Sequence, residues 1–172
     1  QGCNAVRRQN DQTSLRVLTS IGMAQCWLLA RLNGFYHRYP EVDLHLTTRD
    51  STANLDIFGA DITITFDDED EKTKSPSCIF YDNIIAVSSP QLMTKKRMLT
   101  VSELADQHLL HYLEPMQLND WQLLFNSVGV DPPPVEHGSS FNSYAVYLQS
   151  SLNGDGVAIG SEHLLEDYLR SG

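Results

Sequence analysis

The chain has 172 residues, of which 41% are hydrophobic, and its 22 acidic and 12 basic side chains give a formal net charge of −10. Such an acidic chain is poorly suited to contact nucleic-acid phosphates by itself. No apolar run approaches the roughly 20 residues that span a membrane, and the polar first residues are unlike a signal peptide. Three cysteines without C-x-x-C spacing argue against a disulfide framework or a structural zinc site and favour a reducing cytoplasm. We expect one globular unit, or two small subdomains that share a sheet.

The early part of the chain predicts a strand, a helix and a second strand. Residues 15–19 form a short apolar run that ends in hydroxyl side chains. Apolar residues within 28–39 follow helical spacing, and Pro40 ends the helix because it cannot continue the hydrogen-bond ladder. Apolar and polar residues then alternate over 42–47, as in a strand with one solvated face. This unit implies a parallel strand pair, and the polar loop 19–22 lies where such sheets bind ligands.

Short strands and loops follow this first unit. Residues 60–66 alternate again and predict a third strand, after a polar loop at 48–52 whose hydroxyl side chains could cap a short helix. Five consecutive acidic residues at 67–71 indicate a solvated loop, and a site for a hard cation is the alternative. Residues 78–87 predict a strand that enters a second unit. Residues 100–103 have the pattern of a capping box at a helix start.

The second unit again alternates between strands and helices. Residues 108–111 predict a strand, and residues 118–128 predict an amphipathic helix. Asn142 is the predicted cap of a further helix. Residues 157–160 predict an apolar strand, and 161–169 a last helix. This alternation indicates an α/β protein.

One long co-linear pattern runs through residues 15–46. Its members are Leu15, Arg16, Val17, Ser20, Ala24, Trp27, Leu28, Leu29, Arg31, Leu32, Phe35, Arg38, Tyr39, Pro40, Val42, Leu44 and Leu46. The pattern resembles the start of the effector-binding domain of LysR-type transcriptional regulators. Further agreement follows in the same order at residues 88–90, 99–104 and 153–160. The chain departs from the family at Thr65, where an arginine is common.

The resemblance implies an α/β fold with two hinged Rossmann-like subdomains, in the type 2 periplasmic-binding-protein-like architecture, shortened at its carboxyl end. The expected division is 1–14 as a linker remnant, 15–86 as subdomain I, 87–161 as subdomain II, and 162–172 as an incomplete return toward subdomain I. The hinge would lie near residues 85–89 and near residue 160.

The resemblance also implies a bacterial ligand sensor. A small-molecule effector, polar or singly anionic, would bind in the cleft between the subdomains and alter DNA binding by a winged helix-turn-helix domain outside this chain. We expect a cytoplasmic homodimer, or a tetramer of the full-length protein, with no cofactor, no metal and no membrane contact. Two alternatives are a free-standing solute-binding protein of the same fold and a redox sensor that uses Cys26 or Cys78. An enzyme is not expected, since the chain lacks nucleophile, phosphate-loop and zinc-helix motifs.

The resemblance identifies candidate site residues as well. Those expected to line the cleft are Ser20, Gly22, Met23, Ser51, Thr65, Phe66, His111, Phe141, Asn142 and Ser143. The alternative is that they are ordinary cap, loop or packed residues. The two amphipathic helices are expected to pair across a dimer axis through Trp27, Arg31, Phe35, Trp121 and Phe125. Both apolar stripes could instead cover the sheet of their own subdomain.

Overall fold

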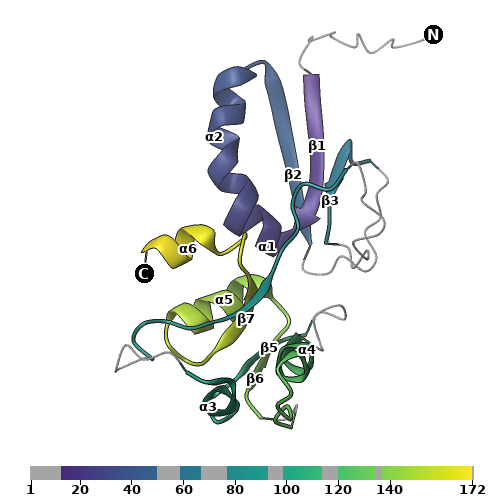
Figure 1. Ribbon diagram of the computed structural model, residues 1–172. Helices are drawn as coiled ribbons and strands as arrows, with labels where there is room; N and C mark the ends of the chain where they lie inside the picture. Colours follow the sequence, from purple (N-terminus) through teal and green to yellow (C-terminus); the bar gives the residue numbers. More distant parts are fainter. Residues whose placement is uncertain are drawn as a thin grey trace, which may run out of the picture.

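The computed structural model describes residues 13–49, 59–66, 77–92, 99–113, 120–134 and 137–171. Figure 1 shows two groups of elements, which we call the first lobe (β1 to β3 and the helical run up to α2) and the second lobe (β4 to β7 and α3 to α5). Helix α6 lies between them. Within the described ranges, no helix combines the length and the apolar character needed to cross a membrane.

A three-stranded parallel sheet forms the first lobe. Strand β1 (Thr13–Ser20) lies between β2 (Val42–Arg49) and β3 (Ile62–Ile64), and both neighbours run parallel to it. The predicted strand–helix–strand unit is therefore confirmed. Side chains on β1 are buried at Val17 and Leu18, as expected for the central strand of a sheet.

One continuous helical run connects β1 to β2. It consists of α1 (Ile21–Met23), the π-helical turn η1 (Ala24–Leu28) and α2 (Leu29–Arg38). The chain leaves the helical conformation at Tyr39, immediately before Pro40, as the sequence predicts. The helical run begins at Ile21, directly after the last residue of β1, and so starts earlier than the amphipathic stripe within 28–39 suggests.

The second lobe contains two strand pairs that meet. Strand β4 (Ile84–Val87) pairs antiparallel with β7 (Ala158–Ser161), and β5 (Leu110–Tyr112) pairs parallel with β6 (Ser139–Phe141). A single parallel bridge between the residues that precede β5 and β7 connects the two pairs. Strands β4 and β7 coincide with the two predicted hinge positions. The exact subdomain boundaries stay a prediction.

Four helices accompany these strands: α3 (Val101–Ala105), α4 (Asp120–Ser127), α5 (Tyr144–Leu152) and α6 (Glu166–Ser171). The predicted capping box at the start of α3 is confirmed: the backbone N–H of Glu103 donates to Thr100 Oγ1 at 3.3 Å, and the N–H of Thr100 donates to Glu103 Oε2 at 2.9 Å.

Other local predictions are corrected by the structure. Asn142 does not cap α5, because the N-cap position is Ser143, whose side chain makes no capping hydrogen bond. The last helix begins at Glu166, after a turn, rather than at Ser161. The predictions at 48–52, including Ser51, lie largely outside the described residues, and the acidic run at 67–71 lies wholly outside them.

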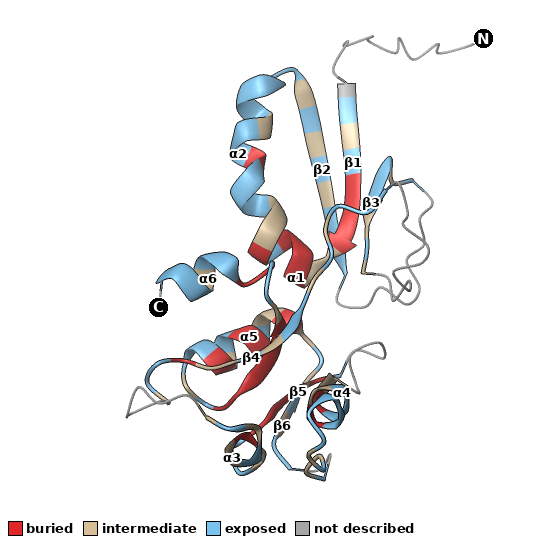
Figure 2. Cartoon of the chain, viewed as in Figure 1, coloured by how far each residue is buried: buried red, intermediate tan, exposed pale blue. Residues whose placement is uncertain are grey.

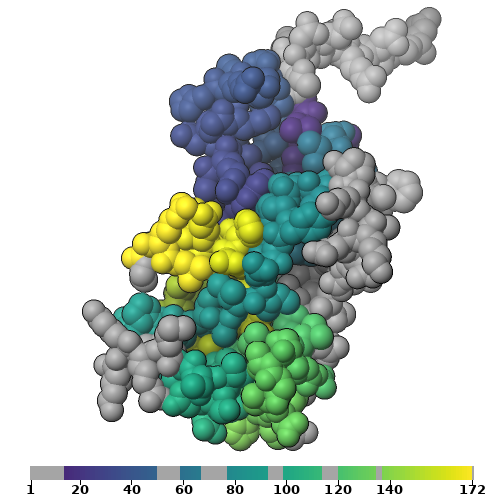
Figure 3. All heavy atoms as spheres, in the orientation of Figure 1, coloured from purple at the N-terminus to yellow at the C-terminus, as the bar shows by residue number. Residues whose placement is uncertain are grey.

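Most buried residues lie in the second lobe, and the larger core cluster reaches from there to the start of the helical run in the first lobe. Figure 2 shows buried residues in α1, α5 and β7, whereas most of α2 and β2 is exposed or intermediate. The larger core cluster contains Met23, Cys26, Leu110, Tyr112, Tyr144, Tyr147, Leu148, Ala158, Leu164 and Leu165. Because its first two members come from the helical run of the first lobe, this cluster spans both lobes. Figure 3 shows α6 and the segment before β4 filling the space between the lobes on one face.

Candidate functional site

Strand β1 places Ser20 at the start of the helical run. The backbone of Ser20 is extended, and its Oγ accepts a hydrogen bond from the backbone N–H of Met23 at 3.1 Å. This is N-cap geometry. Ser20 is partly exposed, whereas the Met23 side chain is buried. The Ser20 hydroxyl hydrogen can therefore serve a ligand beside the first N–H groups of the helix, which attract anions.

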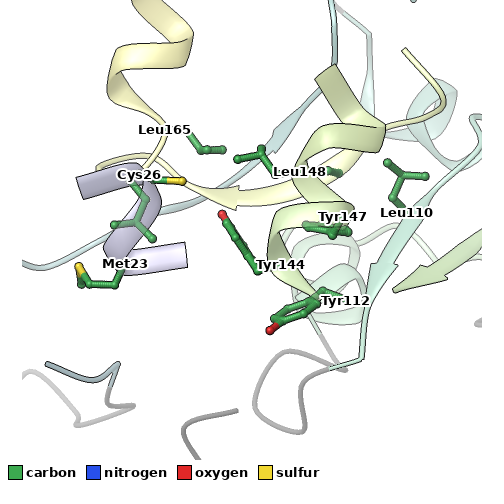
Figure 4. Close-up of a cluster of buried hydrophobic side chains, with 10 residues drawn as sticks. Met23, Cys26, Leu110, Tyr112, Tyr144, Tyr147, Leu148 and Leu165 are labelled. Carbon is green, nitrogen blue, oxygen red and sulfur yellow. The ribbon is translucent and has the colours of Figure 1, made fainter. Parts of the chain in front are cut away.

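Gly22 is the point at which the first lobe contacts helix α5. A Cβ atom placed on Gly22 would lie 2.9 Å from Cδ1 and 3.0 Å from Cε1 of Tyr144. The ring of Tyr144 therefore packs directly against the backbone of α1. Figure 4 shows Tyr144 between the helical segment that carries Met23 and the strand that carries Tyr112. Only glycine permits this close approach without a shift of one lobe.

The end of β3 brings two further predicted residues to the same region. Thr19 is fully buried, and its Oγ1 donates to the backbone carbonyl of Ile64 at 2.9 Å, which fixes β3 against β1. Thr65 follows as an exposed side chain, and Phe66 packs against the larger core cluster. Thr65 is therefore accessible to a ligand, whereas the Phe66 side chain is part of the packing around the larger core cluster. Ser51 lies outside the described residues.

The second lobe contributes residues from β5, β6 and the start of α5. His111 Nε2 lies 2.9 Å from the carbonyl oxygen of His137, which can only accept, so Nε2 donates there. Phe141 pairs with Tyr112 across the strands. Asn142 is exposed, and the Ser143 side chain is not used as a cap. The structure thus ties His111 to its own lobe.

The phenol and the thiol at the lobe junction are neutral at physiological pH. Burial raises the pKa of Tyr144 well above its usual value, and nearby Cys26 raises it further. Burial also raises the pKa of Cys26, from 9.0 to about 11. Since the thiolate is the reactive form, a buried thiol with a raised pKa is a poor peroxide sensor. The redox alternative is therefore not supported at Cys26. Cys78 is exposed.

A hydrogen-bonded cluster that we call the Asp82 clasp joins the segments before β4 and after β7. The Asp82 carboxylate accepts from the Ser161 hydroxyl, and its Oδ1 accepts from the backbone N–H of His163 at 3.2 Å. Asn83 Nδ2 donates to Glu162 Oε2 at 3.0 Å alongside. The clasp therefore ties the two chain segments together beside the proposed hinge.

The residues predicted to form a dimer interface fall into two groups. On the helical run, Trp27, Arg31 and Phe35 are partly buried or exposed, and the Arg31 guanidinium lies 4.4 Å from the centre of the Trp27 ring. On α4, by contrast, Trp121 and Phe125 are 8% and 0% exposed and belong to the second core cluster. Their prediction as interface contacts is wrong for these side chains, which instead cover the sheet of their own lobe.

Sequence reasoning missed two residues that organise this region. Tyr144 escaped notice because its partner Gly22 lies far away in the sequence, and only its place at the start of a predicted helix offered a signal. Asp82 gave no local signal, because its clasp partners are about eighty residues away. Among the described residues, no three histidine, cysteine or carboxylate side chains gather in a way that could hold a metal ion.

Two α/β lobes, joined by the antiparallel pair β4–β7 and meeting at two helix starts, have the type 2 periplasmic-binding-protein-like fold. The family model described as the LysR substrate binding domain matches residues 8–172. The chain therefore belongs to this family, the effector-binding domains of LysR-type transcriptional regulators.

Individual relatives agree with this assignment. The chain is 27% identical over 172 residues to the HTH-type transcriptional regulator DsdC of Escherichia coli K12, a match that covers 97% of this chain and 55% of that protein. The chain thus spans about half the length of this curated relative.

Solved structures share the fold. The AmpR effector binding domain from Citrobacter freundii has a TM-score of 0.69 at 23% identity, covering 93% of this chain and 78% of that one. The CrgA regulatory domain from Neisseria meningitidis has a TM-score of 0.73 at 23% identity, covering 94% and 78% respectively.

Proposed function

We propose that this domain senses a small metabolite in the cleft between its lobes and so controls DNA binding by another part of a longer regulator. The observation that carries the proposal is the Gly22–Tyr144 contact, which joins the lobes at the start of the helical run beside the proposed ligand residue Ser20. A ligand that binds beside this contact interacts with both lobes at once. Its binding then favours one arrangement of the lobes over another, which is how a ligand shifts a conformational equilibrium.

Hydroxyl groups and helix starts determine the kind of ligand that we expect. Ser20 and Thr65 come from the first lobe, and Ser143 comes from the start of α5. Helix starts favour negative charge, because their N–H groups lack partners within the helix. This set favours a small polar or singly anionic metabolite.

The route from ligand to DNA lies outside this chain. Relatives that cover the same region are transcriptional regulators, and the family assignment supports a regulatory role. The formal net charge of −10 makes direct contact with DNA phosphates unfavourable for this domain. We therefore assign DNA contacts to a separate winged helix-turn-helix domain of the full-length protein. As part of a DNA-binding regulator, this domain would act in the cytoplasm.

We further propose that the domain pairs with a second copy through α2 and α4. With Trp121 and Phe125 turned inward, the exposed apolar side chains on these helices include Leu29 on α2, at 53%, and Leu123 on α4, at 59%. Contiguous exposed apolar surface marks protein contacts, and we assign these two side chains to such a surface. Sedimentation at micromolar concentration should show a dimer that Leu29→Asp or Leu123→Asp dissociates. Leu169→Asp on α6 is the matched control and should not. A wild-type monomer would contradict this pairing.

A metabolite screen followed by thermal unfolding tests the sensing proposal. A ligand at a hundredfold excess over its Kd stabilises the folded state by about 2.7 kcal/mol. The stabilisation should be lost in Ser20→Ala, which removes the hydroxyl at the helix start. It should persist in Ser102→Ala, an exposed serine on α3. If no anionic or polar metabolite stabilises a folded chain, or if both variants respond equally, the cleft is not the sensor.

A further inference from the structure

A hollow of about 500 Å³ lies along the outward side of α5. One wall is Gln25, which belongs to η1 in the first lobe. The remaining lining comes from the second lobe, with Phe141 before the helix and Asp155 after it. The volume is within the range of small-molecule sites in proteins, about 300–1,000 Å³. Among the described lining residues, Phe141 alone also belongs to the predicted cleft set.

The helical repeat of α5 produces this outward surface. Its inward side chains, Tyr147 and Leu148 among them, are buried in the core cluster. Ala145, Gln149 and Asn153 follow at intervals of four residues and therefore share the opposite side. Nine helical residues at about 1.5 Å each make α5 roughly 13 Å long. The lining thus has an aromatic residue before the start of α5 and an acidic one after its end.

The polar lining of the hollow offers acceptors beside its one described carboxylate, Asp155. Ser150 Oγ donates to Asp155 Oδ2 at 2.9 Å, and Gln149 Nε2 donates to Asn153 Oδ1 at 2.9 Å. These bonds leave Asp155 Oδ1 and Gln149 Oε1 to accept from a ligand. Among the lining residues that the structure describes, Asp155 is the only charged one. The acidic end therefore favours a cation, as does the formal net charge of −10.

The apolar lining indicates that the ligand has an apolar part as well as a charged group. Ala145 and Val146 line the hollow between Phe141 and the polar groups, and Val146 is 56% exposed. An alkyl or aromatic group would cover this surface. The Phe141 ring, which lies before the start of α5, can pack against apolar groups and against the edges of other aromatic rings.

We propose that this hollow is a second ligand site, separate from the cleft, for a monocationic amine with a short apolar body. The ammonium group would bind Asp155, and the body would lie along Ala145 and Val146 toward Phe141. Because Gln25 belongs to the first lobe and the other residues to the second, the ligand contacts both lobes. Amine binding is then coupled to the arrangement of the lobes, and through it to the effector in the cleft, with equal coupling in both directions.

Three probes of similar length and different charge test the site. Hexylammonium, hexanoate and 1-hexanol are titrated into the 172-residue chain by calorimetry. Hexylammonium should bind saturably, hexanoate should not bind, and hexanol should bind more weakly than the amine. Asp155→Asn should weaken the amine about tenfold or more. It keeps an oxygen for Ser150, and its thermal unfolding should match the wild type. Asp106→Asn, at an exposed aspartate after α3, is the control and should leave binding unchanged.

Three results would overturn the proposal. The first is the absence of saturable hexylammonium binding up to millimolar concentration. The second is equal weakening by Asp155→Asn and Asp106→Asn, which would indicate attraction to the overall acidic surface. The third is loss of amine binding in Ser20→Ala, which would place the amine in the cleft. Because the cleft is tested by the Ser20 variant and the hollow by the Asp155 variant, the two proposals fail separately.

Discussion

Replacing Gly22 by alanine adds one methyl group at the point where the two lobes touch. The new Cβ would lie 2.9, 3.0 and 3.2 Å from three ring carbons of Tyr144. Carbon atoms this close repel each other, and the ring cannot withdraw freely because Tyr144 is only 7% exposed. Either the ring leaves its position in the core or the two lobes separate locally.

The expected cost follows from two opposing effects. Adding a methyl group to a packed site costs about 1–3 kcal/mol of the free energy of unfolding. Alanine in a helix is favoured over glycine by about 0.5–1 kcal/mol. We therefore expect Gly22→Ala to lower the free energy of unfolding by up to about 2.5 kcal/mol, instead of raising it as an alanine in an open helical position would. Urea denaturation, with the slope compared between variants, measures this difference.

Gly34 provides a matched control on the same helical run. It lies within α2, and a Cβ atom placed on it meets nothing within 4 Å. Gly34→Ala should therefore raise the free energy of unfolding by about 0.5–1 kcal/mol. In a Tyr144→Leu background the penalty of Gly22→Ala should shrink, because the flat ring is gone. If Gly22→Ala is as stable as Gly34→Ala, the lobes do not meet at this contact.

Three further predictions concern the junction. Asp82→Asn should lower the free energy of unfolding by about 1–3 kcal/mol in urea, because asparagine keeps only one of the two acceptor oxygens that Ser161 and His163 use; Asp106→Asn should change it little, and equal losses would count against the clasp. Cys78 should react with a thiol reagent at neutral pH at least about a hundredfold faster than Cys26, whose pKa of about 11 suppresses the thiolate; equal rates would mean that Cys26 is not buried. The free energy of unfolding should fall as pH rises above about 9, since the raised pKa values of Cys26 and Tyr144 keep protons bound only in the folded state; a flat alkaline profile would refute this.

Local chemistry explains which parts of the fold were predictable. The strand alternation over β2, the proline that follows α2 and the capping box of Thr100 and Glu103 all involve neighbouring residues. The sequence shows such patterns directly, because their energetics depend on short spacing. The parallel pairing of β1 with β2 followed from the length of the helical connection between them.

Contacts between distant residues explain the parts that were not predictable. The apolar stripe on α4 shows that Trp121 and Phe125 need a partner, but helical spacing does not say whether that partner is the same lobe or a second copy. The structure gives the answer through burial and through the bond from Trp121 Nε1 to the carbonyl of Leu110 at 2.8 Å. The Gly22–Tyr144 contact likewise depends on how the lobes are placed. Neither residue type is unusual in its local setting.

The free energy of the Gly22–Tyr144 contact limits how far a change at this contact alone can shift the equilibrium between lobe arrangements. Moving a two-state equilibrium from 1:99 to 99:1 requires about 5.5 kcal/mol of differential binding. A methyl group at Gly22 is expected to change the energetics of the lobe contact by about 1–3 kcal/mol, so it would move the equilibrium only part of the way. The effector that we propose would therefore need to gain most of its differential affinity from groups on both lobes, for which Ser20 and Ser143 are the proposed candidates. If the effector works in this way, removing either hydroxyl should weaken both its affinity and its power to shift the lobes, whereas a ligand held by one lobe alone would bind without any shift.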